Sequence, residues 1–551
     1  MKKTFRVRRR AVAKDAVAGV VLGVESVPDG LAAGLLAGVN PLAGLYAYMF
    51  GTLGGAVFTS SAFMAVQGTG AMGIIVADVP AVHGATDPAR ALFTLAMLTG
   101  LIMVVAGLLR LGFVLRFVPN TVMVAFLSAV GVNIVLGQFA NFTGYEADGA
   151  NRVLRALDTV LHPGLLDAQS VTVGAVTLAL ILLFERTRIG AFGLVVAVAV
   201  TSVAVRLLGW TGVRVVEDLS AVPNALPMPV APDLRAVPGL LVPALALAFV
   251  GLLQGAAISA GFPNPDGRYP DASRDFVGQG AANVTSGVFQ GMPVGGSVSG
   301  TSLNRAAGAR SRLSLFIAAA VMAVVVVAFA GMVGQIVMPA LAALLMLIGV
   351  RTIKPAALWA VWRTGGVQKT VLVSTFVLTM LIPLQYAVLA GVGLSVVLHV
   401  IRQSHQVTIR RWRLDPDGQV VESDPPAELP SDEVVVLQPY GSLMFAAARV
   451  LEDQLPTPSD TSRNCVVIIR LRGREQLDTT FLGVLRRYAE ALRARDSRLV
   501  LVSAGDRVRR QLRVAGLTEL VEVYSGDERV GASVRRAYDD ATAWLQEQRD
   551  S

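Results

Sequence analysis

Residues 107–139 read GLLRLGFVLRFVPNTVMVAFLSAVGVNIVLGQF, and this stretch decides the fold class of the chain. A short turn that carries Arg110 joins two apolar segments. About 20 apolar residues are enough for a helix to cross a bilayer, and the second segment exceeds that length. Nothing inside it is polar enough for chemistry in solution. The stretch therefore predicts an α-helical membrane protein.

Composition divides the chain into two regimes. Of its 551 residues, 54% are hydrophobic and only 16% are charged, which is too little charge for a soluble protein of this size. Charged residues are rare between residues 16 and 109, whereas they recur every few residues after Asp432. Two regimes imply two solvents, lipid and water. We therefore predict a basic cytoplasmic N-terminus at 1–14, a transmembrane domain at 15–402, a linker at 403–431 and a water-soluble domain at 432–551.

The net charge of +9 does not indicate nucleic-acid binding. Much of the excess sits in short turns and in an N-terminal run, where the positive-inside rule accounts for it as a topology signal. A specific lipid site is the alternative interpretation of that run. The run consists of Lys2, Lys3, Arg6, Arg8, Arg9, Arg10 and Lys14.

Other chemistry is not indicated by the sequence. No GxxxxGK[ST] motif occurs, so ATP is not bound through a P-loop. The four histidines lie far apart without metal-ligand spacing, and the single Cys465 excludes an intrachain disulfide. We therefore expect no enzyme activity, no cofactor and no metal, and transport energy that comes from gradients.

Fourteen apolar stretches follow one another along the chain, several of them too short to span alone. Basic residues gather in the turns on one side of the predicted membrane, and an even number of spans places both termini on that cytoplasmic side. The sequence thus predicts a multi-pass protein of the cytoplasmic membrane. The stretches lie near 16–38, 43–58, 63–79, 91–109, 113–139, 168–185, 189–208, 238–259, 276–290, 296–307, 313–334, 336–350, 370–384 and 386–401.

Two short segments, seven apart in the count, are rich in Gly, Ser and Thr. They are 60–76 (SSAFMAVQGTGAMGIIV) and 295–309 (GGSVSGTSLNRAAGA). Interrupted segments in matching positions of two halves point to a transporter site. A half-helix that starts in mid-membrane presents unpaired N–H groups and a positive dipole end, which together attract an anion. The alternative is that the small residues only permit close helix packing.

Further motifs resemble the sulfate permease family, the bacterial relatives of solute carrier family 26. One is 27–32 (VPDGLA), which LAGVNPLAGLYA follows. The other matches the family at Gln279, Gly280, Asn283, Gly291, Pro293, Gly296, Ser297, Ser299, Thr301, Asn304, Gly308, Arg310 and Arg312. The resemblance covers nearly the whole chain. It implies fourteen segments as a seven-plus-seven inverted repeat, a core domain that moves against a gate domain in an elevator-like way, and a homodimer.

The resemblance also implies an anion site between segments one, three, eight and ten. We predict that the third segment faces the tenth across the bound anion and that both present N–H and hydroxyl donors to it. The predicted anion-binding residues are Gln67, Gly68, Thr69, Ser297, Ser299 and Thr301.

The chain departs from the family pattern at this site. Gly300 stands where the family usually has Arg, and Gln254 stands where many bacterial members carry a carboxylate. Asp29 replaces a first-segment Gln, one turn after Glu25. A carboxylate repels an anion unless it is protonated or paired, so we predict that Asp29, and with it Glu25, couples anion movement to a proton. The alternative is that both acids point into a wet cavity without a role in transport.

The region after Asp432 alternates strands and helices. Strands are predicted at 434–439, 465–471 and 498–505, and helices at 443–455, 479–496 and 507–517, which indicates a small sheet covered by helices. This resembles the STAS domain (sulfate transporter and anti-sigma antagonist). In stand-alone members the loop that corresponds to Asp478, Thr479 and Thr480 is phosphorylated at its first hydroxyl residue, here Thr479. A helix start at Asp478 is the plainer interpretation.

Together these features predict secondary active transport of a small anion through the lipid bilayer. Sulfate is the family default, and bicarbonate and dicarboxylates are alternatives. Two other classes stay open: an anion channel, which unlike a carrier would not show saturable flux coupled to another ion, and a membrane regulator acting through the STAS unit.

Overall fold

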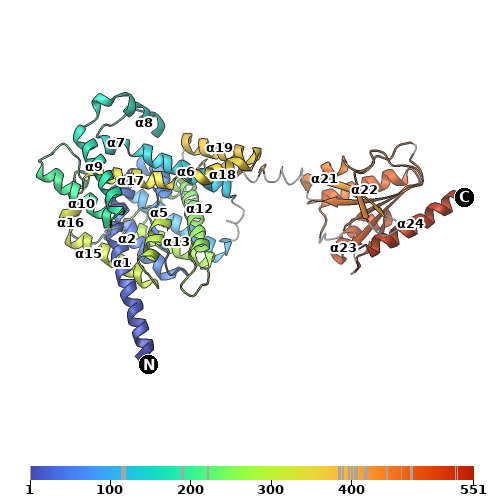
Figure 1. Cartoon of the computed structure of the whole chain (residues 1–551), viewed down its shortest axis with the longest axis horizontal. Helices are drawn as coiled ribbons and strands as arrows, with labels where there is room; N and C mark the ends of the chain where they lie inside the picture. Colours follow the sequence, from blue (N-terminus) through green and yellow to red (C-terminus); the bar gives the residue numbers. More distant parts are fainter. Residues whose placement is uncertain are drawn as a thin grey trace. The chain divides into compact units, whose positions relative to one another are not determined.

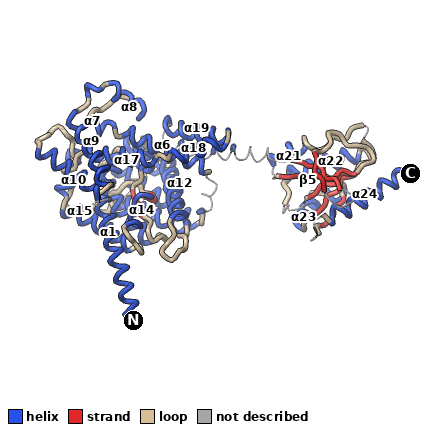
Figure 2. Tube along the Cα trace, in the orientation of Figure 1, coloured by secondary structure: helices blue, strands red, loops and turns tan. Residues whose placement is uncertain are grey.

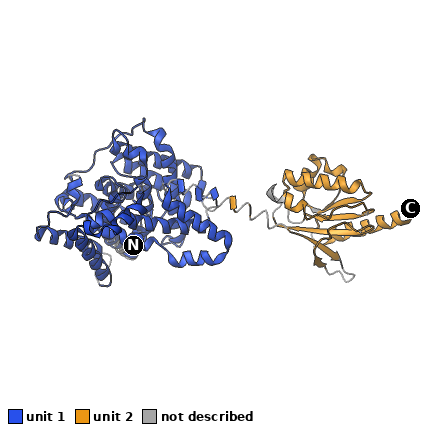
Figure 3. Cartoon of the chain, turned by 90° about the horizontal axis from the view of Figure 1, so that it is seen from above, with its two compact units in different colours: residues 1–395 blue, residues 396–551 orange. Residues whose placement is uncertain are grey.

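The computed structural model describes residues 2–112, 119–149, 151–187, 192–219, 222–382, 408–414, 420–441, 445–460, 462–471, 476–527 and 531–550, with short stretches between 386 and 401 and Arg529. The chain forms two compact units, residues 1–395 and residues 396–551 (Figure 3). Each unit has its own apolar core.

The first unit is almost entirely helical (Figure 1). Several of its helices begin at a polar cap followed by proline, as at Asn40–Pro41 and Asp87–Pro88, where proline lacks only an N–H that would be unpaired anyway. The helices are α1 (Lys2–Leu36), α2 (Pro41–Phe58), α3 (Gly70–Ala77), α4 (Pro80–His83), α5 (Pro88–Leu108), α6 (Asn120–Gly137), α7 (Phe139–Thr143), α8 (Arg152–Leu161), α9 (Ala168–Glu185), α10 (Phe192–Leu207), α11 (Val216–Leu219), α12 (Val237–Gly261), α13 (Ala272–Val288), α14 (Val298–Ala306), α15 (Leu313–Ala328), α16 (Ala330–Gly334), α17 (Met338–Thr352), α18 (Pro355–Thr364) and α19 (Gly366–Leu381).

Seven helical segments of the described chain are long and apolar enough to cross a membrane, and three shorter apolar helices accompany them. The prediction of a helical membrane protein is therefore confirmed, whereas the count of fourteen segments stays a prediction. In the stretch that decides the fold, α5 ends at Leu108 and α6 begins at Asn120. Residues 113–118, with which the predicted fifth segment opens, lie outside the described residues.

The long helices pack as two groups. The first helix group comprises α1, α2, α3, α5 and α12 to α15, and the second comprises α6 to α10 and α17 to α19. Each half of the chain thus supplies a run of first-group helices and then a run of second-group helices. The groups meet where α1 packs against α10 and α17 and where α3 packs against α6.

Two very short strands, β1 (Ala65–Gln67) and β2 (Gly295–Ser297), interrupt the helical unit (Figure 2). They pair antiparallel, with Ala65 opposite Ser297 and Gln67 opposite Gly295. All six strand residues are buried. Each strand leads directly into a short helix, β1 into α3 and β2 into α14.

The second unit is a six-stranded sheet with the order β4-β3-β5-β6-β7-β8. Strands β5 to β8 run parallel, and β3 is antiparallel to both of its neighbours. The strands are β3 (Thr408–Leu414), β4 (Val420–Ser423), β5 (Val434–Tyr440), β6 (Val466–Arg470), β7 (Arg498–Ala504) and β8 (Glu522–Ser525). The helices are α21 (Phe445–Glu452), α22 (Thr479–Arg493), α23 (Asp506–Val514) and α24 (Ala532–Asp550).

Successive side chains of the central strands point to opposite faces of the sheet, so the apolar core of this unit has two parts. Val435 and Val467 face α21, α22 and α23, whereas Val436 and Ile468 face α24. The three predicted strands and three predicted helices are confirmed. Strands β3, β4 and β8 and helix α24 were not predicted. The segment 403–431, predicted to be a linker, contributes β3 and β4 to the sheet.

Candidate functional site

The β1–β2 pair brings together the two segments that the sequence singles out. Because the strands are antiparallel, α3 and α14 leave the pair in opposite directions, each starting within the buried interior of the first helix group. Two broken helices therefore begin side by side, and both turn their N-terminal ends toward the strand pair.

Each half-helix has a hydroxyl cap. Thr69 Oγ1 accepts a hydrogen bond from the Met72 N–H (3.3 Å), and Ser297 Oγ accepts one from the Gly300 N–H (3.1 Å). The remaining N–H groups of each first turn have no acceptor within their own helix. Since these groups carry the positive end of the helix dipole, the caps mark two electropositive points that bear no full charge.

Three of the polar side chains implicated in the site stand at its open side. Ser299 is exposed, and its hydroxyl lies 3.1 Å from that of Ser297. The Thr69 hydroxyl donates to Gln254 Oε1 of α12 over 3.0 Å, and both of these side chains are partly exposed. Ser299, Thr69 and Gln254 are therefore at least partly accessible to an incoming group.

The other predicted residues hold the strand pair together. The Gln67 side chain is 2% exposed, and its Nε2 donates to Ser26 Oγ of α1 (2.8 Å). Thr301 Oγ1 accepts from the Ala65 N–H (3.1 Å), which fastens α14 to β1. The Gly68 carbonyl accepts from the Tyr48 hydroxyl (2.8 Å). In this conformation the Gln67 side chain is therefore bonded to α1, and the Thr301 hydroxyl is bonded to β1.

Gly300 is required by the close approach of Gln67. A Cβ atom at residue 300 would lie 2.3 Å from Gln67 Oε1 and 3.2 Å from the Ala65 Cβ. Any side chain here would displace the Gln67 amide. Where the family usually has Arg, this chain has Gly300, and the Gln67 amide occupies the space that a side chain at residue 300 would need.

Two amides of α13 support the site, and the sequence analysis assigned them no role. Gln279 Oε1 accepts from the Gly296 N–H (3.1 Å). Asn283 bonds both backbone groups of Val294, accepting from its N–H (2.9 Å) and donating to its carbonyl (2.7 Å). Both side chains are fully buried. Amides within a segment expected to lie in the membrane are the signal that would have identified them, because a bilayer leaves backbone groups of irregular segments without water.

Glu25 and Asp29 lie one turn apart on α1, the helix that carries Ser26. Each is partly exposed, yet Glu25 Oε2 and Asp29 Oδ1 are buried and have no hydrogen-bond partner among the described residues. Helix α1 packs against α10 and α17 of the second helix group and against the half-helices α3 and α14. The acids therefore sit at the contact between the two helix groups, beside the half-helices.

Three cavities of about 650, 800 and 830 Å³ open elsewhere in this unit, and none of the three is lined by the six predicted anion-binding residues. Within the described ranges no group of three or more His, Cys, Asp or Glu side chains is arranged to hold a metal ion. Among the described residues, the half-helix site offers two helix N-termini and the hydroxyls of Thr69, Ser297 and Ser299.

The predicted regulatory loop lies in the second unit. Asp478 caps α22, and its Oδ1 accepts from the Thr480 N–H (2.9 Å). Thr479 is exposed at the first position of the helix. Arg472 and Gly473, which precede this loop, lie outside the described residues.

This architecture, with two half-helices meeting inside a helical membrane unit, is that of a membrane transporter. Residues 12–375 match the sulfate permease family and residues 429–530 match the STAS domain, so the chain belongs to the sulfate permease family. It is 25% identical over 509 residues to the putative sulfate transporter YvdB of Bacillus subtilis, covering 92% of this chain and 94% of YvdB. It is 28% identical over 417 residues to the bicarbonate transporter BicA of Synechocystis, covering 73% and 72% respectively.

Solved structures agree on the fold. The structure of murine Slc26a9, described as an anion transporter in its inward-facing state, superposes with a TM-score of 0.83 at 16% identity and covers 97% of this chain and 91% of that one. The transmembrane domain of a cyanobacterial BicA gives a TM-score of 0.59 at 24% identity, covering 70% and 98%. The predicted family and fold class are thus confirmed.

Proposed function

We propose that this protein is a secondary active transporter of a small oxyanion, sulfate or bicarbonate, in the cytoplasmic membrane. One observation carries the proposal: two capped half-helices begin side by side, with the hydroxyls of Thr69 and Ser299 accessible. An oxyanion placed there accepts bonds from hydroxyls and first-turn N–H groups and is stabilised by both dipoles. The names of the relatives supply the two anions.

The movement we propose is elevator-like. The half-helices, their α13 supports and α1 all belong to the first helix group, so the site can travel as one body. The second group contacts it through α6, α10 and α17 and would serve as the fixed frame. A site carried by a rigid body keeps its donors in place, which preserves affinity during transit.

We further propose that the anion moves with a proton. Glu25 and Asp29 each leave a carboxylate oxygen without a hydrogen-bond partner in the described structure, and both adjoin the site. Protonation removes the charge that repels an anion, and the bound anion favours protonation in return, because coupling between sites is reciprocal. Uptake should then rise as external pH falls.

A flux screen tests the proposal. Purified full-length protein in proteoliposomes is supplied with sulfate, bicarbonate, oxalate, fumarate or chloride, with and without an inward proton gradient. We expect saturable uptake of sulfate or bicarbonate that a protonophore collapses. Flux that does not saturate would favour a channel, and no flux of any of these anions would exclude the proposed function.

Orientation and assembly complete the proposal. We propose that both termini and the STAS domain are cytoplasmic and that the protein is a homodimer. A cysteine at Asp148 should react with an impermeant maleimide added to intact cells, whereas one at Asp453 of the STAS domain should react only after permeabilisation. Equal labelling of both in intact cells would contradict this topology.

A further inference from the structure

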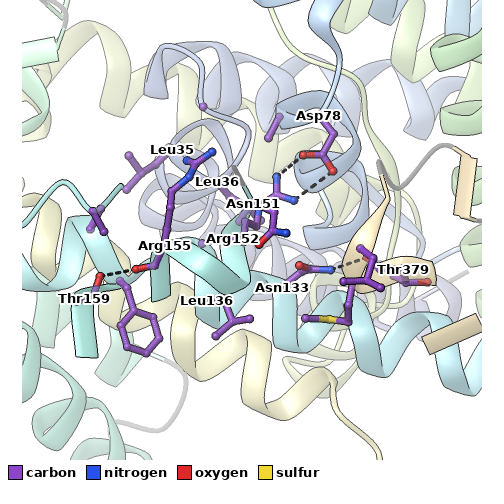
Figure 4. A pocket seen from close by; sticks show the side chains of 18 of the residues that line it. Leu35, Leu36, Asp78, Asn133, Leu136, Asn151, Arg152, Arg155, Thr159 and Thr379 are labelled. Atoms are coloured by element: carbon purple, nitrogen blue, oxygen red, sulfur yellow. Dashed lines mark hydrogen bonds and ion pairs between the residues drawn. The ribbon is translucent and has the colours of Figure 1, made fainter. Parts of the chain in front are cut away.

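A cavity of about 650 Å³ opens between the two helix groups, at the end of α1 far from its N-terminus (Figure 4). The first group contributes Leu36 and Asp78, which lies just past the end of α3. The second group contributes Asn133 of α6 and Arg152 of α8. The cavity therefore lies where relative movement of the groups would change its shape.

Asp78 and Arg152 form a two-pronged ion pair across this cavity. Arg152 Nη2 lies 2.8 Å from Asp78 Oδ1, and Nη1 donates to Oδ2 over 3.1 Å (Figure 4). Their side chains are 19% and 21% exposed, so the pair remains accessible from the cavity. Of the ion pairs found in the described part of this unit, it is the one that ties the first helix group to the second.

A second cation stands beside the pair. Arg155 follows Arg152 by three residues on α8, which places both on one face of the helix. Its Nε donates to the Gly149 carbonyl (3.1 Å), and no described carboxylate pairs with it. The other acid of the cavity, Glu146, is paired with Arg214 (3.0 Å). The cavity thus holds one cation whose charge no ion pair offsets.

Building on the proposed function, we propose that this cavity is an outer binding site for the transported anion, in which Arg152 exchanges Asp78 for the anion while Arg155 completes the site. Carboxylates and oxyanions bind a guanidinium through the same two-pronged geometry, so the exchange replaces one strong interaction by another of similar kind. Asp78 terminates α3, and Thr69 caps the start of the same helix. When the anion takes the place of Asp78 on Arg152, the ion pair that joins α3 to α8 is broken, and α3 is the helix that carries Thr69 of the inner site.

Three variants of the full chain separate this proposal from a merely structural ion pair. Initial uptake is measured in intact cells against external concentration of the anion that the flux screen identifies, and the melting temperature is measured on purified protein. R152Q should raise the external KM about tenfold. D78N should lower it, because Arg152 is then freely available. R155Q should raise it severalfold and leave the melting temperature unchanged.

R235Q serves as the matched control, since it removes an exposed arginine that does not line this cavity, and its KM should stay at the wild-type value. A structural pair alone would make D78N and R152Q shift KM in the same direction. That result, or an unchanged KM in R155Q, would overturn the outer site. Absence of flux in the wild type would instead exclude the proposed function, so the two failures are distinguishable.

Discussion

Replacing Gly300 by alanine tests whether the Gln67 amide holds the half-helices together. The new Cβ would lie 2.3 Å from Gln67 Oε1, about 1 Å closer than a carbon and an oxygen normally approach, so the amide must move. Movement breaks its 2.8 Å bond to Ser26 inside the first helix group. A buried amide left without its partner costs about 1–3 kcal/mol, and alanine returns up to about 1 kcal/mol of helix propensity. The net effect is a loss of about 1–2 kcal/mol.

The sign of this effect should reverse once Gln67 is removed. In a Q67A background two of the three atoms nearest to the new Cβ are gone and the milder 3.2 Å contact with Ala65 remains, so G300A should be neutral or stabilising. The coupling between the two substitutions is then about 2 kcal/mol. Melting temperatures of the four proteins in detergent measure it. G331A is the control, because nothing lies within 4 Å of its added Cβ. If G300A destabilised equally in both backgrounds, the amide would not be the obstacle and the reasoning would fail.

Three further predictions follow from the site and the tail. S299W should raise the KM for the anion at least tenfold by filling the opening, whereas S299A should raise it about fivefold by removing one donor; unchanged affinity in S299W would move the site elsewhere. D29N should abolish both the rise of anion uptake at low external pH and the accumulation of the anion against its gradient, while anion exchange continues. Continued accumulation of the anion by D29N would exclude Asp29 as the coupling group. Cys465 is fully buried and donates to the Pro430 carbonyl, and burial raises the pKa of its thiol. A maleimide should therefore modify it only when the STAS domain unfolds, and rapid labelling of native protein at neutral pH would contradict this.

The pairing of the two interrupted segments agrees with the sequence pattern, in which glycine and hydroxyl residues interrupt two otherwise apolar stretches. Composition reveals such breaks, but it does not reveal which partners satisfy the freed backbone. Gln279 and Asn283 bond residues that lie beyond the end of α13, and Gln67 bonds Ser26, which is 41 residues away. These contacts depend on how the helices pack and cannot be read from the sequence pattern, whereas the expectation that Gln67 binds the anion stays a prediction.

The tail shows the same limit in a soluble fold. Its central strands are continuous runs of Val, Ile and Leu, as expected for parallel strands covered on both faces, and they were predictable. Strand β3 reads TIRRWRL, and its three arginines obscure the apolar pattern of a strand even though Ile409 is buried. Helix α24 buries mainly small residues such as Ala537 and Ala541, which give a weak periodic signal.

Polar groups inside the membrane unit differ in whether they have hydrogen-bond partners. A bilayer supplies no water, so irregular backbone within it must find partners or line a cavity. Around the half-helices the protein provides such partners, through the β1–β2 pair, Gln279 and Asn283. Buried polar atoms without a hydrogen-bond partner in the described structure nevertheless remain on Glu25, Asp29, Gln279 and Asn304, and such atoms are costly to stability. The two acids differ from the amides because protonation removes their charge, so the proposed co-transported proton would lower this cost at Glu25 and Asp29.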